Sequence, residues 1–140
     1  MIDYTNYRLA LKHLEVQIAN FESSAQRPQL TELDREGIRE SVIQRFETAY
    51  ELSWKFVKRY LTEELGQVDT PNSPKPVFKL ADQNNLLRGR IDEWLGYANA
   101  RVATAHDYSG EKAEETLAVI PSFLEDAIGL YQTMTEATWE

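Results

Sequence analysis

The feature that most constrains the fold is a long run of apolar residues at steps of three and four between residues 31 and 65. Because an α-helix turns every 3.6 residues, such steps place the side chains along one face. The stripe consists of Ile38, Val42, Phe46, Tyr50, Trp54, Val57, Leu61 and Leu65, widened by Ile43, Ala49 and Phe56. Thr31, with an acidic residue three positions later, fits a helix cap, and Gly66 is a natural stop. We expect one long helix here, packed against several partners.

Three other segments show the same spacing. Helices are expected over residues 3–23, 88–108 and 111–138, and a short one after the Pro- and Gly-rich loop at 66–76. No stretch alternates convincingly with period two, so no strand is predicted. The sequence therefore predicts an all-α fold: a single domain over 1–140, built as an antiparallel up-and-down four-helix bundle with a short extra helix in the middle connection.

Several finer expectations concern the ends and faces of these helices. Asp3 or Thr5 should cap the first helix, and Ser73 should cap the short one. Pro121 lies inside the last segment and should kink or break it near residues 117–121. In the segment 88–108, the spacing predicts that six residues face inward: Ile91, Trp94, Leu95, Ala98, Val102 and Ala105.

Composition limits the class of protein. The chain has 140 residues, of which 42% are hydrophobic, and it has no cysteine. That content suffices for a real core, and the absence of thiols fits a reducing cytoplasm. No apolar run approaches the roughly 20 residues of a membrane span, and no signal-peptide core is present. We expect a cytoplasmic protein with no membrane association.

The net charge of −8 argues against general binding of nucleic acid, and no DNA partner is expected. The acidity is uneven, however. Residues 106–140 carry one basic and eight acidic side chains, whereas residues 41–105 carry nine basic and eight acidic ones. A local contact with RNA therefore stays compatible with the sequence in the middle of the chain.

The run from Trp94 to Tyr108 holds the candidate chemistry, because it combines Arg101, His106 and Tyr108 at the predicted end of a helix. The simpler interpretation is structural. A solvated arginine and a histidine at a helix C-terminus are common, and Tyr108 fits a half-buried aromatic at a helix end. In the functional interpretation, the arginine holds a phosphate, the histidine transfers a proton near neutral pH, and the phenol stacks on a ligand or is modified.

Geometry restricts the functional interpretation. Five residues at about 100° each separate Arg101 from His106 by about 140° around an unbroken helix. The two side chains can converge only if the helix ends before His106, or if a second copy of the chain completes the cleft. If they converge, the pair suits metal-independent cleavage of RNA by its own 2′-hydroxyl.

Other polar residues are weaker candidates. Glu47 and Glu51 lie four apart on one helix face and could line the cleft with Asn99, although such carboxylate pairs are more often solvated or salt-bridged. His13 has no second histidine at ligand spacing, so no metal site is predicted. No Gly-rich phosphate loop occurs, and no cofactor is expected.

Two runs resemble a known family. The run from Ile43 to Leu61, IQRFETAYELSWKFVKRYL, and the later Trp94–Tyr108 run followed by Ala113-Glu114-Glu115 are similar to signatures of the nucleotidyltransferase substrate-binding protein family. The resemblance covers roughly residues 5–135. It implies the HEPN fold, an antiparallel four-helix bundle, and usually a homodimer that brings two Arg-x4-His motifs into one cleft.

The resemblance also implies partners and roles. The expected partner is a minimal nucleotidyltransferase that acts as an antitoxin. The chain itself would be a ribonuclease toxin, neutralised when the partner transfers AMP to the tyrosine that corresponds to Tyr108. One departure is Val102, since many relatives carry a polar residue, commonly Asn, after the motif arginine. It leaves open the alternative of a non-catalytic subunit that presents substrate to the nucleotidyltransferase.

Overall fold

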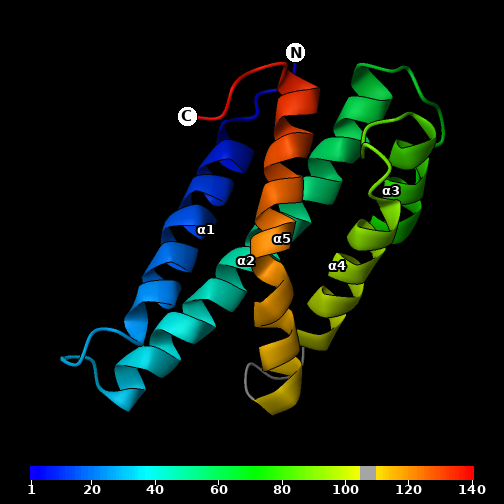
Figure 1. The fold of residues 1–140 in the computed structure, drawn as a ribbon. Helices are drawn as coiled ribbons and strands as arrows, with labels where there is room; N and C mark the ends of the chain where they lie inside the picture. Colours follow the sequence, from blue (N-terminus) through cyan, green and yellow to red (C-terminus); the bar gives the residue numbers. More distant parts are fainter. Residues whose placement is uncertain (105–109) are drawn as a thin grey trace.

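A computed structural model of the chain describes residues 1–104 and 110–140, and every regular element in these ranges is an α-helix (Figure 1). The prediction of an all-α fold is therefore confirmed. The helices are α1 (Thr5–Ser24), α2 (Glu32–Glu63), α3 (Pro74–Gln83), α4 (Ile91–Thr104) and α5 (Gly110–Thr135).

Four long helices run alternately up and down, and α3 is the short extra helix of the middle connection (Figure 1). Helix α1 packs on α2 and α5, whereas α4 packs on α2, α3 and α5. The longest helix, α2, thus contacts all four others, as its wide apolar stripe predicts. This arrangement places the middle of α2 against the last turns of α4.

The ends of α2 follow the predicted signals. Thr31 accepts a hydrogen bond from the Asp34 backbone N–H at 3.0 Å, and the Asp34 carboxylate accepts one from the Thr31 N–H at 2.9 Å. Gly66 follows the other end with a φ of +67°, a conformation that glycine adopts without strain. Ser73 holds the cap position of α3 in extended backbone, but its side chain makes no capping bond.

Of the kink or break expected near residues 117–121, the break does not occur, because helix α5 runs through Pro121 as one helix. Proline cannot donate the hydrogen bond to the carbonyl of Leu117, four residues earlier. Pro121 lies on the exposed side of the helix. The missing hydrogen bond therefore does not interrupt the apolar face of α5, which stays continuous.

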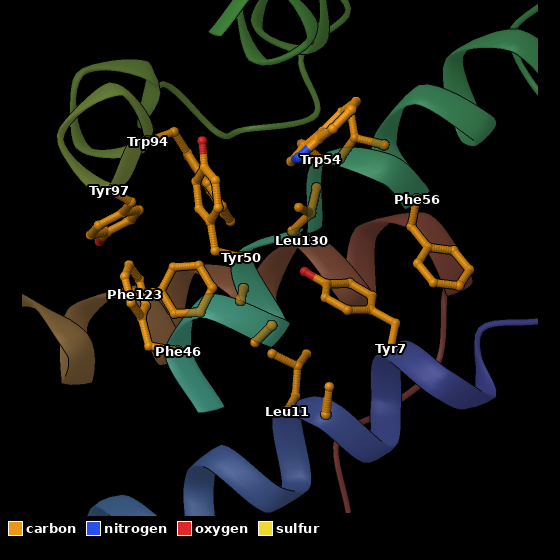
Figure 2. Close-up of a cluster of buried hydrophobic side chains, with 14 of the residues drawn as sticks. Tyr7, Leu11, Phe46, Tyr50, Trp54, Phe56, Trp94, Tyr97, Phe123 and Leu130 are labelled. Carbon is orange, nitrogen blue, oxygen red and sulfur yellow. The ribbon is translucent and has the colours of Figure 1, made fainter. Parts of the chain in front are cut away.

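Aromatic rings form much of the core, in two groups (Figure 2). Near α4, Phe123 makes edge contacts with Phe46, Trp94 and Tyr97 at centroid distances of 5.0–5.7 Å. Near the chain ends, Phe56 stacks on Tyr4 and Tyr7 at 5.4 and 5.5 Å. The first group fixes α4 against α2 and α5.

The predicted inner face of α4 needs one correction. Trp94 and Ala98 are buried as expected, but Val102 is 64% exposed, so its prediction as an inward residue was wrong. Tyr97, which the spacing did not select, is buried instead and contacts Trp94 and Phe123. The buried face of α4 is thus rotated toward Tyr97, and Val102 points to solvent.

Candidate functional site

Arg101 lies in the last turn of α4 and faces two carboxylates of α2. Its Nη1 atom is 3.1 Å from Glu47 Oε2, and its Nε atom is 3.8 Å from Glu51 Oε1. Glu47 and Glu51 stand one turn apart on α2, so their side chains project from the same face. The structure therefore brings together three of the residues that the sequence analysis singled out.

Thr104 is a member of this cluster that the sequence analysis missed. It is buried, and its Oγ1 lies 2.9 Å from both Glu47 Oε2 and the backbone carbonyl of Arg101. The hydroxyl thus ties the Glu47 carboxylate to the last turn of α4. The available signal was its position three residues after Arg101, which puts both residues within one turn.

The two carboxylates differ in their surroundings. The Glu47 side chain is only 14% exposed, whereas that of Glu51 is 38% exposed and accepts a hydrogen bond from Trp54 Nε1 at 3.1 Å. Arg101 Nε is buried without a hydrogen-bond partner in the described ranges. The guanidinium is therefore held in place by its charge contacts with the two carboxylates.

A polar network between α4 and α5 fixes the first half of α4. Arg90 donates two hydrogen bonds to the Asp126 carboxylate, at 2.8 and 3.1 Å, and Tyr97 donates one at 2.5 Å. Burial is the main cause that raises the pKa of Tyr97 to about 12, and the hydrogen bond to Asp126 is the second. Tyr97 thus stays a neutral donor that ties α4 to α5.

The remaining predicted residues lie elsewhere. Asn99 is exposed and accepts a hydrogen bond from Lys75 Nζ of α3 at 2.7 Å, which draws its side chain toward α3. His13 is on α1, with its Nδ1 atom 3.3 Å from Arg45 Nη1. His106 and Tyr108 lie outside the described residues, so their placement stays a prediction.

A hollow of about 500 Å³ opens beside Arg101. Its walls come from α2, the start of α3 and the outer side of α4, and they include Tyr50, Pro74 and Val102. Glu51, Lys75 and Arg101 supply the charged groups of its lining. The guanidinium therefore lies where a bound molecule can reach it.

Two further properties concern the part of the chain that the structure describes. No group of three or more His, Cys, Asp or Glu side chains there is placed to hold a metal ion. None of the helices in residues 1–104 and 110–140 is both long and apolar enough to cross a membrane.

Comparison with known proteins gives consistent matches. The family model described as "Nucleotidyltransferase substrate binding protein like" matches residues 2–136. A Haemophilus influenzae protein called "Probable ribonuclease HepT" is 32% identical over 96 residues, which span 67% of this chain and 65% of that protein. The chain thus spans slightly less than two thirds of this relative's length.

Two solved structures share the fold. One, HI0074 from Haemophilus influenzae, is described as revealing the fold of a substrate binding domain of a nucleotidyltransferase. It superposes with a TM-score of 0.84 and 25% identity, over 94% of this chain and 98% of that one. A Thermus thermophilus protein gives a TM-score of 0.67 and 27% identity, over 87% and 98% of the two chains.

Proposed function

Because the chain belongs to the nucleotidyltransferase substrate-binding protein family, we propose that it is a HEPN-type ribonuclease whose activity a partner nucleotidyltransferase controls. The single observation that carries the proposal is Arg101, held by Glu47 and Glu51 at the edge of an open hollow and followed in the sequence by His106. The name of the Haemophilus influenzae relative supports the same activity.

The proposed reaction is transesterification within RNA. The 2′-hydroxyl oxygen attacks the neighbouring phosphorus as His106 accepts its proton, and the bond from phosphorus to the 5′-oxygen breaks. The leaving 5′-oxygen takes a proton from water, and His106 returns its proton to the solvent. The products are a 2′,3′-cyclic phosphate and a free 5′-hydroxyl. Arg101 holds the phosphate and stabilises the charge that develops on it. We propose that a homodimer brings two copies of the motif into one cleft, which supplies the convergence that an unbroken helix lacks.

Glu47 serves in this proposal as a positioning residue. Its carboxylate contacts both Arg101 and Thr104, and it is the less exposed of the two acids. Glu47→Ala should lower kcat for RNA cleavage about 10-fold or more while KM changes little, because Arg101 loses its orientation. The matched control is Glu63→Ala, which removes an exposed carboxylate of the same helix. Equal losses in both variants would contradict the positioning role.

The proposed partner is a minimal nucleotidyltransferase that uses ATP to modify Tyr108. The phenol oxygen attacks the α-phosphorus of ATP, pyrophosphate leaves, and the phenol proton passes to a base of the partner. The adenylylated tyrosine would block the approach of RNA to Arg101 and His106. Mass spectrometry of the chain after incubation with the partner and ATP should show addition of one AMP, which Tyr108→Phe abolishes.

The decisive experiment compares RNA cleavage by the wild type with that by Arg101→Ala and His106→Ala in buffer containing a chelator. We expect both variants to lose roughly 100-fold or more in rate, since each lacks a group needed in the transition state. Thermal unfolding of all three proteins shows whether the variants are folded. Cleavage at the same rate by all three would remove the proposal.

A second candidate function has its own observation. Val102 places an exposed apolar side chain directly after Arg101, where the family resemblance leads us to expect a polar residue. This favours a non-catalytic subunit that presents substrate to the nucleotidyltransferase. In that case, the purified chain should form a complex with its partner and raise the partner's activity, while it cleaves no RNA.

A further inference from the structure

The hollow beside Arg101 combines apolar walls with a few polar groups, as ligand sites commonly do. Pro74, Ala98 and Val102 supply apolar surface on its sides, and its volume is about 500 Å³. Flat ring systems with polar edges suit such a space. Nucleobases have this shape, because their faces are apolar and their edges carry hydrogen-bonding groups.

Tyr50 contributes a phenol to the lining of this hollow. The residue is 1% exposed, and it is part of the lining. Within residues 1–104 and 110–140 its hydroxyl makes no hydrogen bond, whereas the buried hydroxyl of Tyr7 bonds to Ser53 at 2.8 Å. Figure 2 shows the Tyr50 ring extending from α2 away from α1. A phenol hydroxyl can both donate and accept a hydrogen bond, so a ligand in the hollow can bond to it.

The charges of the lining match a nucleotide. Arg101 and Lys75 are the two cations of the lining and Glu51 is its carboxylate, while Glu47 contacts Arg101 at 3.1 Å from outside the lining. The cations can attract a phosphate. The Glu51 carboxylate is held in orientation by the hydrogen bond from Trp54 Nε1, so it can accept hydrogen bonds from a base edge.

We infer that this hollow binds the guanine base of an RNA nucleotide next to the phosphate held by Arg101. Guanine presents two neighbouring N–H donors to a carboxylate, whereas uracil presents one N–H between two carbonyl oxygens. Glu51 accepts from guanine, Tyr50 supplies one further polar contact, and Val102 covers a face of the ring. The inference rests on the proposed function, since it names the base that a ribonuclease would select.

Binding of guanosine and uridine 5′-monophosphates, measured by calorimetry without turnover, tests the inference. We expect the guanosine nucleotide to bind about 10-fold more tightly, which is the discrimination typical of one bidentate contact. Glu51→Gln should abolish this preference, because the amide no longer offers two acceptors. Glu63→Gln, on the same helix, should retain it.

Two further variants test the walls. Val102→Trp should fill the hollow and weaken binding of the guanosine nucleotide about 10-fold or more, whereas Val16→Trp, at a valine that is 66% exposed, should leave it unchanged. Tyr50→Phe should weaken binding about 3- to 10-fold, the loss typical of one hydrogen bond, without lowering stability. If Val102→Trp instead changes only the oligomeric state and neither nucleotide binds, the hollow is covered by a second copy and the inference is overturned.

The outcomes separate this inference from the proposed function. Cleavage of RNA without guanosine nucleotide binding would overturn the base site and leave the ribonuclease standing. Selective binding of the guanosine nucleotide without cleavage would support the base site and remove the ribonuclease. If both hold, cleavage of RNA by the wild type should favour sites with guanine, and Glu51→Gln should lose that preference.

Discussion

Tyr7 and Tyr50 are both buried, but within residues 1–104 and 110–140 only the Tyr7 hydroxyl makes a hydrogen bond. Tyr7 bonds to Ser53 Oγ, which itself donates to the Ala49 carbonyl at 2.8 Å. The Tyr50 side chain, in contrast, lines the hollow beside Arg101. Burial is the main cause that raises the pKa of both phenols, so both remain neutral near pH 7.

This contrast gives a stability prediction. Tyr7→Phe should lower the free energy of unfolding by about 1 kcal/mol, because a buried hydrogen bond is lost. Tyr50→Phe should leave it within about 0.5 kcal/mol of the wild type, since its hydroxyl bonds to none of the described residues. Urea unfolding followed by tryptophan fluorescence measures both values. A larger loss for Tyr50→Phe than for Tyr7→Phe would contradict this account.

The sequence predicted which residues of α4 are buried where apolar spacing decides their burial. It failed where a hydrogen bond to a distant residue decides it. Trp94 and Ala98 follow the apolar spacing, and both are buried. Tyr97 is buried because its hydroxyl has Asp126 as a partner, a residue 29 positions later that no local pattern reveals. Val102 is exposed because the buried face of α4 is turned toward Tyr97.

Among the elements, α2 shows most directly how local signals define a helix. Thr31 and Asp34 exchange two hydrogen bonds at its start, and these satisfy N–H groups that the helix itself cannot. Thr31→Ala should lower the free energy of unfolding by about 1 kcal/mol, as measured by urea titration. Ser73→Ala is a suitable control, because the Ser73 side chain makes no capping bond and the change should have little effect.

The same cap makes a pH-dependent prediction. The hydrogen bonds from Thr31 lower the pKa of Asp34 below its ordinary value of 3.8. Its contribution to stability is therefore fully present above pH 3.8 and is lost as the pH falls through the lowered value. The stability difference between wild type and Asp34→Ala should be constant above that pH and shrink below it. A difference that grows on acidification would show that the cap is not the cause.

In helix α5, by contrast, packing outweighs the local signal of Pro121, which favours the end of a helix. Pro121 removes one hydrogen bond, but Ile120, Phe123 and Ala127 keep their places in the core. Pro121→Ala should restore that bond and raise the free energy of unfolding by about 1–3 kcal/mol. Thermal or urea unfolding checks this. A loss of stability instead would mean that the core is built around a bend at this position.

At the scale of the whole molecule, the C-terminal segment after α5 packs back onto α1. Trp139 lies with its ring 4.2 Å from Lys12 Nζ and donates a hydrogen bond to Glu15 at 3.1 Å. It also meets Tyr131 edge-on at 5.5 Å. Trp139→Ala should lower the free energy of unfolding by about 1–2 kcal/mol. Thr138→Ala, at an exposed neighbour, should change it little, and equal effects would argue against this packing.

The order and number of the helices in the described ranges could be predicted from the sequence, because each helix has its own periodic stripe. The end signals were less reliable, since Asp3 or Thr5 was expected to cap α1 but its N-cap is Tyr4, which makes no side-chain capping bond. The site could be predicted only in part. Arg101 and its two carboxylates came from residue type and spacing, but their joint geometry depends on how α4 packs against α2. Thr104, Lys75 and the hollow depend on contacts between helices, and such contacts leave no mark in a single sequence.

The up-and-down arrangement also places the two ends of the chain at the same end of the bundle, away from the end of α4 and the start of α5 (Figure 1). The Arg8 guanidinium even donates a hydrogen bond to the Glu140 carbonyl at 2.9 Å. A sensor chip or a fluorescent protein attached at the amino end would therefore stand a full helix length from Arg101. Immobilised in this way, the protein can be screened against oligonucleotides and candidate partners with the proposed site at Arg101 oriented toward the solution.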